Sequence, residues 1–187
     1  MSERHARGAE RRRYLGPWRL DVTVRPGVPV PVSAASLART AAAALDVAGA
    51  PRPASLGLIL SNDLELAALN AEHLGETGPT DVLSFPLLPP EAFAGRAEGR
   101  ISPGAKFVLP PGRRIHLGDI VISVQRATAQ ARAGRGGQTG DVHWSASDEL
   151  RLLVTHGALH VCGWDHGTPA EEAAMRTLEQ RLLKAGQ

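Results

Sequence analysis

Four segments of the chain have the hydrophobic pattern of β-strands. Trp18–Val24 alternates apolar and polar residues, as expected for a strand with one buried face. Ser55–Leu60 and the shorter Val82–Phe85 predict two further strands. Ile115–Val124 has the clearest strand pattern in the chain, and we expect it near the centre of the sheet.

Helices are predicted between and after these strands. Ser33 can cap a helix, because its side chain accepts a hydrogen bond from a free amide of the first turn, and Asn62 with Glu65 three residues later forms a capping box. The predicted helices span about 33–47, 62–72, a short stretch from 125, 147–162 and 169–185. Strands that alternate with helices predict an α/β (α+β) fold, a single domain with a small mixed β-sheet packed by helices.

We expect the domain to cover residues 17–187, since 187 residues suit one core of ordinary size and the sequence contains no internal repeat. Two segments rich in Pro or Gly predict connections, a long loop at about 86–114 and a shorter one at 134–140. Apolar residues make up 43% of the chain and aromatic residues 4%, so aliphatic side chains must fill the core.

Residues 1–16 predict a disordered basic arm. The first 13 residues contain five arginines and two glutamates, a net charge of +3, and the whole chain has +2, so the remainder is close to −1. A basic arm can bind nucleic-acid phosphates by releasing counterions. A solubilising leader or a misassigned start codon explains the charge equally well.

The sequence has no sign of a membrane segment. No stretch reaches the roughly 18–20 consecutive apolar residues of a membrane-spanning helix, and the charges at the start are not followed by the apolar region of a secretory signal. Cys162 is the single cysteine, which excludes an internal disulfide and suits a reducing compartment. We therefore expect a cytoplasmic protein with no membrane partner, and a buried Cys162 thiol that points away from any metal.

Three histidines near the end of the chain have the spacing of a metal site. His156 and His160 lie four residues apart in a predicted helix, so their rings project from one face. Gly163 can adopt a positive φ and turn the chain back towards them, followed by His166 three residues later. Three nitrogen ligands leave one coordination position open for water, as in catalytic zinc sites. The pattern predicts one Zn²⁺ per chain bound by these three histidines.

The spacing H-x3-H-x2-G-x2-H also places three histidines on zinc in metzincin proteases. Those enzymes have a glutamate directly after the first histidine as general base, and here that position is Gly157. Because general-base catalysis contributes about 10²–10⁴-fold to the rate, a metallopeptidase is the less favoured interpretation. Asp165, the nearest carboxylate in sequence, could orient a ligand histidine, act as a base or cap the turn; we favour the first role.

The sequence resembles the YbeY family of endoribonucleases in three ordered blocks. Residues 156–166, HGALHVCGWDH, closely match the family signature HGxLHLxGYDH, with Trp164 where the family commonly has Tyr. A block over residues 69–86, LN followed by PTDVLSFP, resembles a second family motif. Residues 117–123, LGDIVIS, resemble a third. The order of the blocks along the chain is also that of the family.

The resemblance implies a zinc-dependent, single-strand-specific endoribonuclease that acts in 3′-end maturation of small-subunit (16S) rRNA and in ribosome quality control. Its partners would be single-stranded rRNA and the small ribosomal subunit with its proteins. We expect the catalytic residues to be His156, His160 and His166, as metal ligands, and Asp165.

The sequence departs from the family where Tyr-Arg-Gly is usual, since it has His-Leu-Gly there and Leu74 replaces the arginine. A guanidinium stabilises the negative charge that develops in phosphodiester cleavage. Its loss leaves open a second interpretation, a ribosome-assembly factor with a structural zinc and weak or no cleavage. Arg113, Arg114 and Arg126 are candidates to replace it.

Other positions have structural interpretations at least as good as functional ones. Thr80, Asp81 and Ser84 could line a cleft, or cap a turn and the edge of a strand. Asp119 lies inside an apolar strand and would need a buried partner. Met175 shares a helix face with other apolar residues, which predicts a core position in place of one beneath the metal.

Overall fold

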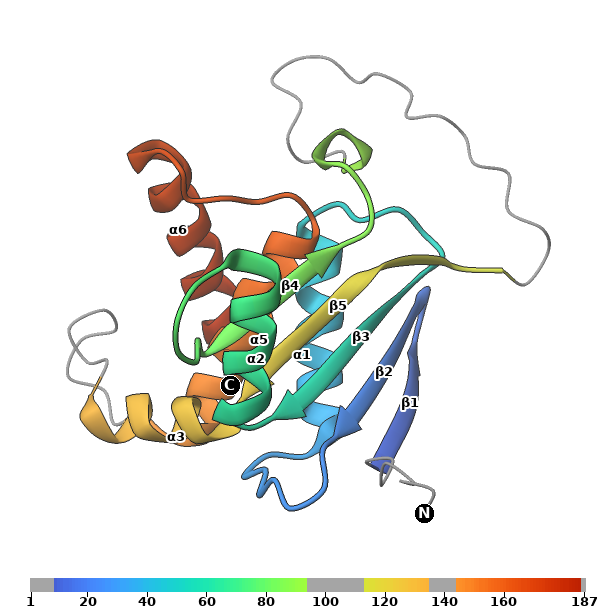
Figure 1. Ribbon diagram of the computed structural model, residues 1–187. Coiled ribbons are helices and arrows are strands. Elements are labelled where there is room, and N and C mark those ends of the chain that lie inside the picture. The colour runs from blue at the N-terminus through green and yellow to red at the C-terminus, as the bar shows by residue number, and fades with distance from the viewer. Residues whose placement is uncertain (1–8, 94–112, 135–143, 186–187) are drawn as a thin grey trace.

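The protein is built on a five-stranded mixed sheet, seen in a computed structural model that describes residues 9–93, 113–134 and 144–185 (Figure 1). The strands lie in the order β1-β2-β3-β5-β4. Their bounds are β1 Ala9–Leu15, β2 Trp18–Val24, β3 Ala54–Ser61, β4 Val82–Pro86 and β5 Ile115–Ser123. β2, β3 and β5 run parallel, and β1 and β4 are antiparallel edge strands. The four predicted strands are confirmed, with β5 between β3 and β4.

Strand β1 corrects the prediction of a disordered arm over residues 1–16, which is wrong from Ala9 onwards. β1 pairs with β2 along its whole length, and Arg12 Nε lies 2.8 Å from Asp21 Oδ1 across the pair. A charged edge strand is compatible with a sheet, because an edge strand needs few apolar residues and charges on it oppose edge-to-edge aggregation. Residues 1–8 lie outside the described part of the chain, and the domain begins no later than Ala9.

Helices cover both faces of the sheet. Their bounds are α1 Ala34–Val47, α2 Asp63–Leu74, α3 Val124–Ala133, α5 Ala146–Val161 and α6 Pro169–Ala185, with a 3₁₀ turn η1 at Pro90–Ala92. α1 and α5 pack on one face and α2 on the other, while α6 packs against α5 on its outer side (Figure 1). The α/β single-domain prediction is confirmed. Most of the predicted 86–114 loop lies outside the described residues, which resume at residue 113.

The helix caps follow the sequence with one difference. Ser33 accepts a hydrogen bond from the Ser36 amide, as predicted. Asn62 likewise accepts from the Glu65 amide, but the Glu65 carboxylate bonds to Arg25 at 2.6–3.2 Å and to Ser61. A long-range ion pair therefore takes the side chain that a complete capping box would use.

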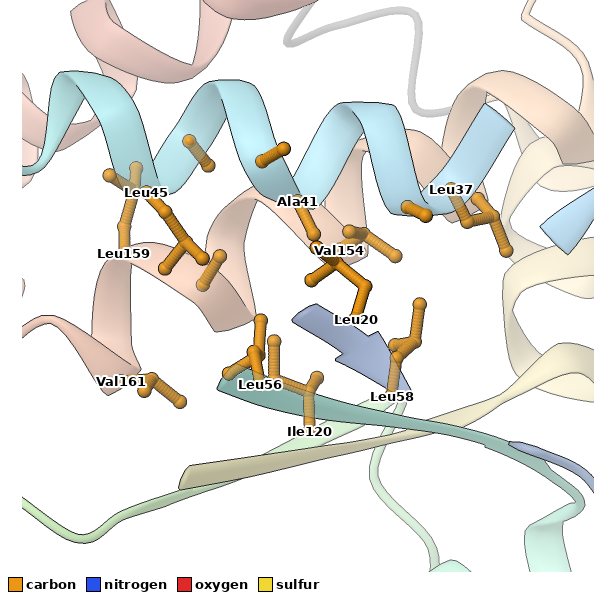
Figure 2. Packing of buried hydrophobic residues seen from close by; sticks show 14 of the residues in the cluster. Leu20, Leu37, Ala41, Leu45, Leu56, Leu58, Ile120, Val154, Leu159 and Val161 are labelled. Carbon is orange, nitrogen blue, oxygen red and sulfur yellow. The ribbon is translucent and has the colours of Figure 1, made fainter. Parts of the chain in front are cut away.

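The core lies between the sheet and the pair α1 and α5. Figure 2 shows α1 side chains directed towards the sheet, with α5 side chains beside them. The labelled residues are Leu37, Ala41 and Leu45 of α1, Leu20, Leu56, Leu58 and Ile120 of the sheet, and Val154, Leu159 and Val161 of α5. Because several buried residues of α1 are alanines, α1 can pack closely against its neighbours. Helix α5 is held in place by aliphatic contacts with α1 on one side and with the sheet on another. Of the helices within the described ranges, none has the length and apolarity to cross a bilayer.

Candidate metal centre

Helix α5 brings two of the predicted metal ligands together. Ser145 and Asp148 form a reciprocal capping box at its start, and ten of its residues, most of them apolar, are buried. His156 and His160 therefore project from the same, partly exposed face, one turn apart. Their Nε2 atoms lie 3.1 Å apart and their ring centroids 4.5 Å apart.

The turn after α5 returns the chain to this face. Gly163 has φ +79°, in the left-handed region, and the Trp164 amide donates to the Leu159 carbonyl at 3.0 Å. A Cβ at residue 163 would lie 2.9 Å from Pro90 Cα, so both the backbone angle and the close approach require glycine. The result is that the His166 ring centroid lies 5.0 Å from that of His160 and 5.8 Å from that of His156.

The three imidazoles fit a single metal ion. One nitrogen from each of His156, His160 and His166 lies within 4.8 Å of the others. Two nitrogens each about 2.1 Å from a tetrahedral ion would be roughly 3.4 Å apart, close to the 3.1 Å between the first two. Among the described residues, the cluster comprises these three ligands and no fourth side chain. The three histidines thus converge as the sequence predicts, in a group that could hold a metal ion.

Burial keeps His160 in the neutral form that a metal requires. Its pKa falls from 6.5 to about 4, first because of desolvation and then because charge on His156 or His166 would repel a second proton. A neutral imidazole offers a lone pair where a protonated one cannot.

Glu179 of α6 is a residue of this site that the sequence analysis missed. Its Oε1 lies 2.7 Å from His156 Nδ1, and its side chain is only 14% exposed. A carboxylate on Nδ1 fixes the ring and leaves Nε2 facing the other two histidines. The available signal was helical spacing, since Glu179 is four residues after the buried Met175 and shares its inward face.

Asp165 lies in the turn, where it supports His166 through the backbone. Its Oδ1 accepts a hydrogen bond of 2.8 Å from the His166 amide, and the residue is exposed. Its charge also opposes the fall in the pKa of His160. This contact is that of a turn cap, and the carboxylate found on a ligand ring is that of Glu179.

The surroundings of position 157 explain why α5 has a glycine where metzincin proteases have a glutamate. The glycine faces the sheet, and a Cβ there would lie 2.7 Å from Ile120 Cγ2 and 3.2 Å from Ser84 Oγ. Ser84 also donates to the Gly157 carbonyl at 3.3 Å. A glutamate at 157 would collide with β5 and would not face the three imidazoles, which agrees with the low rank we give to a metallopeptidase.

Other residues singled out in the sequence take structural places. Cys162 is fully buried, and desolvation raises the pKa of its thiol to about 12. Met175 is 2% exposed in the core, as predicted. The prediction that Asp119 has a buried partner is wrong. Its side chain is 44% exposed, and its Oδ1 lies 3.3 Å from Nε2 of His116, which is also partly exposed.

Residues 80–84 combine capping with a place near the site. Asp81 accepts hydrogen bonds from the Val82 amide and from Thr80 and Gln130, and it also lines the groove described below. Both interpretations of this carboxylate therefore apply.

A groove runs from the metal centre along α6. Its volume is about 410 Å³, and α5, α6 and the start of β4 form its walls. Arg176 lines it, whereas Arg114 binds the Pro17 carbonyl at 2.6 Å and Arg126 lies 3.7 Å from Asp63. Of the arginines proposed to compensate for Leu74, Arg114 and Arg126 are thus engaged elsewhere. Leu74 itself is 62% exposed at the end of α2.

The sequence is similar to known endoribonucleases. The family model for endoribonuclease YbeY matches residues 30–187. Proteins named endoribonuclease YbeY from Roseiflexus sp. (strain RS-1) and Thermobifida fusca (strain YX) are 33% and 38% identical to the chain, over 89% and 88% of its length and 91% of each relative. The fold is similar to the solution structure of a Thermotoga maritima protein, with a TM-score of 0.50 and 18% identity over 88% of each chain.

Proposed function

The chain belongs to the YbeY endoribonuclease family, and from this we propose that it is a zinc-dependent endoribonuclease that cleaves single-stranded RNA. The observation that supports the site of cleavage is the convergence of His156, His160 and His166, with one nitrogen of each within 4.8 Å of the others. Three imidazole nitrogens in a small cluster are a donor set that zinc prefers.

Zinc at this centre would supply a Lewis acid that polarises a phosphate oxygen and lowers the pKa of a water molecule towards 7. Side chains of the protein position two of the histidines, and burial affects the protonation of the third. Glu179 lies 2.7 Å from His156 Nδ1 and orients the ring with Nε2 towards His160, and burial favours the neutral form of His160. Asp165 fixes the His166 backbone, and we propose that its exposed carboxylate takes a proton from the attacking water.

The groove beside the histidines supports a strand as substrate in preference to a duplex. It is small, about 410 Å³, and partly apolar, with Val82, Leu152 and Leu183 among its lining residues. An unpaired base can enter such a groove, while a base held in a duplex cannot reach it without being flipped out. We propose 16S rRNA near its 3′ end as the cytoplasmic substrate, with the small ribosomal subunit and its proteins as partners in maturation and quality control.

Leu74 supports a second candidate function. An exposed leucine at the end of α2, where the family has an arginine, cannot stabilise a phosphate charge. A ribosome-assembly factor with a structural zinc and weak cleavage would tolerate that replacement.

A cleavage assay separates the two functions. Purified protein with one equivalent of Zn²⁺ is incubated with a single-stranded oligoribonucleotide and with the same strand in a duplex. We expect cutting of the single strand alone, loss of cutting with EDTA, and recovery when Zn²⁺ is restored. His160→Ala should abolish both zinc binding and cleavage. His116→Ala is the matched control, because His116 contacts Ser55 and Asp119, away from the cluster.

The outcomes are distinct. Cutting that persists after chelation and in His160→Ala contradicts the proposal, since it indicates a contaminating nuclease. Stoichiometric zinc and binding to small subunits, with no cutting by the wild-type protein, supports the assembly factor.

A further inference from the structure

Arg176 is distinctive among the residues around the metal centre. The groove beside the histidines is lined by one face of α6, on which Glu172, Arg176 and Glu179 follow each other at intervals of four and three residues. Of the described lining residues, Arg176 has the only permanent positive charge. Glu179 of the same face is the carboxylate bonded to His156, so the guanidinium lies one helical turn from a residue of the metal site.

The Arg176 guanidinium can exchange its present partner, Glu172, for a ligand in the groove. Arg176 Nη2 lies 2.6 Å from Glu172 Oε1, in a pair whose side chains are 52% and 53% exposed. An exposed pair of this kind contributes little to stability, so a stronger ligand can displace the glutamate at small cost. Both members of the pair line the groove.

Arg176 is the lining residue of the groove to which a phosphate can bind, because the lining carboxylates repel one. Asp81, Glu172 and Glu179 line the groove, and an RNA strand would meet net repulsion there without a cation. A guanidinium can bind two phosphate oxygens through two parallel hydrogen bonds. Its present contact with Glu172 of the same helix is one hydrogen bond from Nη2. The apolar lining, which includes the partly exposed Val82 and Leu183, suits the unpaired base or ribose next to that phosphate.

We propose that Arg176 is a substrate-binding residue that contacts the RNA phosphate flanking the cleaved one, and so supplies the positive charge that Leu74 does not. The inference rests on the proposed function and deepens it, because it defines the direction in which the strand leaves the metal centre, along α6. Binding of a flanking phosphate raises the effective concentration of the scissile bond at the metal and fixes its orientation.

The test uses full-length, zinc-loaded protein and a single-stranded oligoribonucleotide. Arg176→Ala should lower kcat/KM about 10- to 100-fold, the effect of one charge-assisted hydrogen bond. Arg176→Lys should recover only part of this, because lysine lacks the two-point geometry. Arg181→Ala is the matched control, an exposed arginine of the same helix that does not line the groove, and it should remain within about twofold of wild type. Zinc content and melting temperature should be unchanged in all three.

Two further readouts do not depend on cleavage. In anisotropy titrations of zinc-free protein, Arg176→Ala should reduce the slope of log K against log salt by about 0.7, the value for one phosphate contact on a single strand. A methylphosphonate at one flanking position should weaken wild-type binding and leave Arg176→Ala unaffected, since the neutral linkage removes the same interaction.

If the wild-type protein cleaves RNA, and Arg176→Ala and Arg181→Ala change kcat/KM by the same factor, this inference alone is overturned. A wild-type protein that neither binds nor cleaves RNA would overturn the proposed function, and the role of Arg176 with it.

Discussion

Glu179 Oε1 and His156 Nδ1 lie 2.7 Å apart, and this contact joins α6 to the metal centre on α5. Its consequence is chemical as well as structural. Because a carboxylate on Nδ1 orients the ring, Nε2 of His156 faces Nε2 of His160, 3.1 Å away.

The first prediction concerns this contact. Glu179→Ala should lower the affinity for Zn²⁺ about 10- to 100-fold, the usual cost of removing a carboxylate from a ligand histidine. Glu179→Gln should cost less, because its amide oxygen can still accept the hydrogen bond although the negative charge is gone. The affinity is measured by competition with a chromophoric chelator at fixed pH.

Glu172→Gln is the matched control for metal affinity, since Glu172 lies on the same helix face and pairs with Arg176 without touching a ligand histidine. Equal affinities for Glu179→Ala and this control would show that Glu179 does not support the metal centre.

Gly157 is the subject of the second prediction. Gly157→Ala should reduce the free energy of unfolding, because its Cβ would lie 2.7 Å from the branched side chain of Ile120. Overpacking costs about 1–3 kcal/mol, and the higher helix propensity of alanine returns about 1 kcal/mol, so we expect a net loss of up to about 2 kcal/mol in urea denaturation.

The same position separates nuclease from peptidase. Gly157→Glu should be less stable still and should show no cleavage of casein, because the new carboxylate faces β5. A Gly157→Ala protein about 1 kcal/mol more stable than wild type, as helix propensity alone predicts, or peptidase activity in Gly157→Glu, would contradict the orientation of this residue.

The sequence alone predicted that the three histidines converge, because they are close in the chain. His156, His160 and His166 span one helix turn and one glycine turn, where spacing determines which side chains meet. Glu179 and Arg176 were missed because they lie beside the histidines through the packing of α6 on α5. Helical spacing places Glu179 on the inward face of α6, but it does not tell which part of α5 that face meets.

At the other end of the chain, the high charge led to a wrong prediction of disorder. The arginines at 11–13 indicated an unstructured arm, yet β1 pairs with β2 along seven residues. Compositional rules for disorder assume that a segment must bury apolar surface by itself. An edge strand instead gains backbone hydrogen bonds from a neighbour that is already folded, and the Arg12–Asp21 pair accommodates part of its charge.

The third prediction is that Cys162 is chemically inert in the folded protein. It is fully buried, and desolvation raises its pKa to about 12, so almost no thiolate exists at pH 8. Iodoacetamide at pH 8 should therefore modify it only in denaturant, as followed by intact mass. Cys162→Ala should keep one zinc per chain. Rapid alkylation under native conditions, or loss of zinc in this variant, would mean that the thiol is exposed or near the metal.

The last prediction is a dependence of stability on pH from Glu65 and Arg25. Arg25 donates to the Glu65 carboxylate at 2.6–3.2 Å and holds its pKa below the ordinary 4.5, although burial acts in the opposite direction. A carboxyl whose pKa is lower in the folded state stabilises the fold above its unfolded pKa, and this contribution disappears as the pH falls through the folded pKa.

Glu65→Gln should therefore lower the free energy of unfolding at pH 7 by about 1 kcal/mol or less, given that both side chains are partly exposed. The difference from wild type should shrink below about pH 4.5, as the wild-type carboxyl is protonated. Glu72→Gln, an exposed change on the same helix, should follow wild type throughout. Urea denaturation at pH 7, 5, 4 and 3 measures all three proteins. A Glu65→Gln deficit that is constant over this range would assign the effect to packing, because a charge interaction must vanish with the charge.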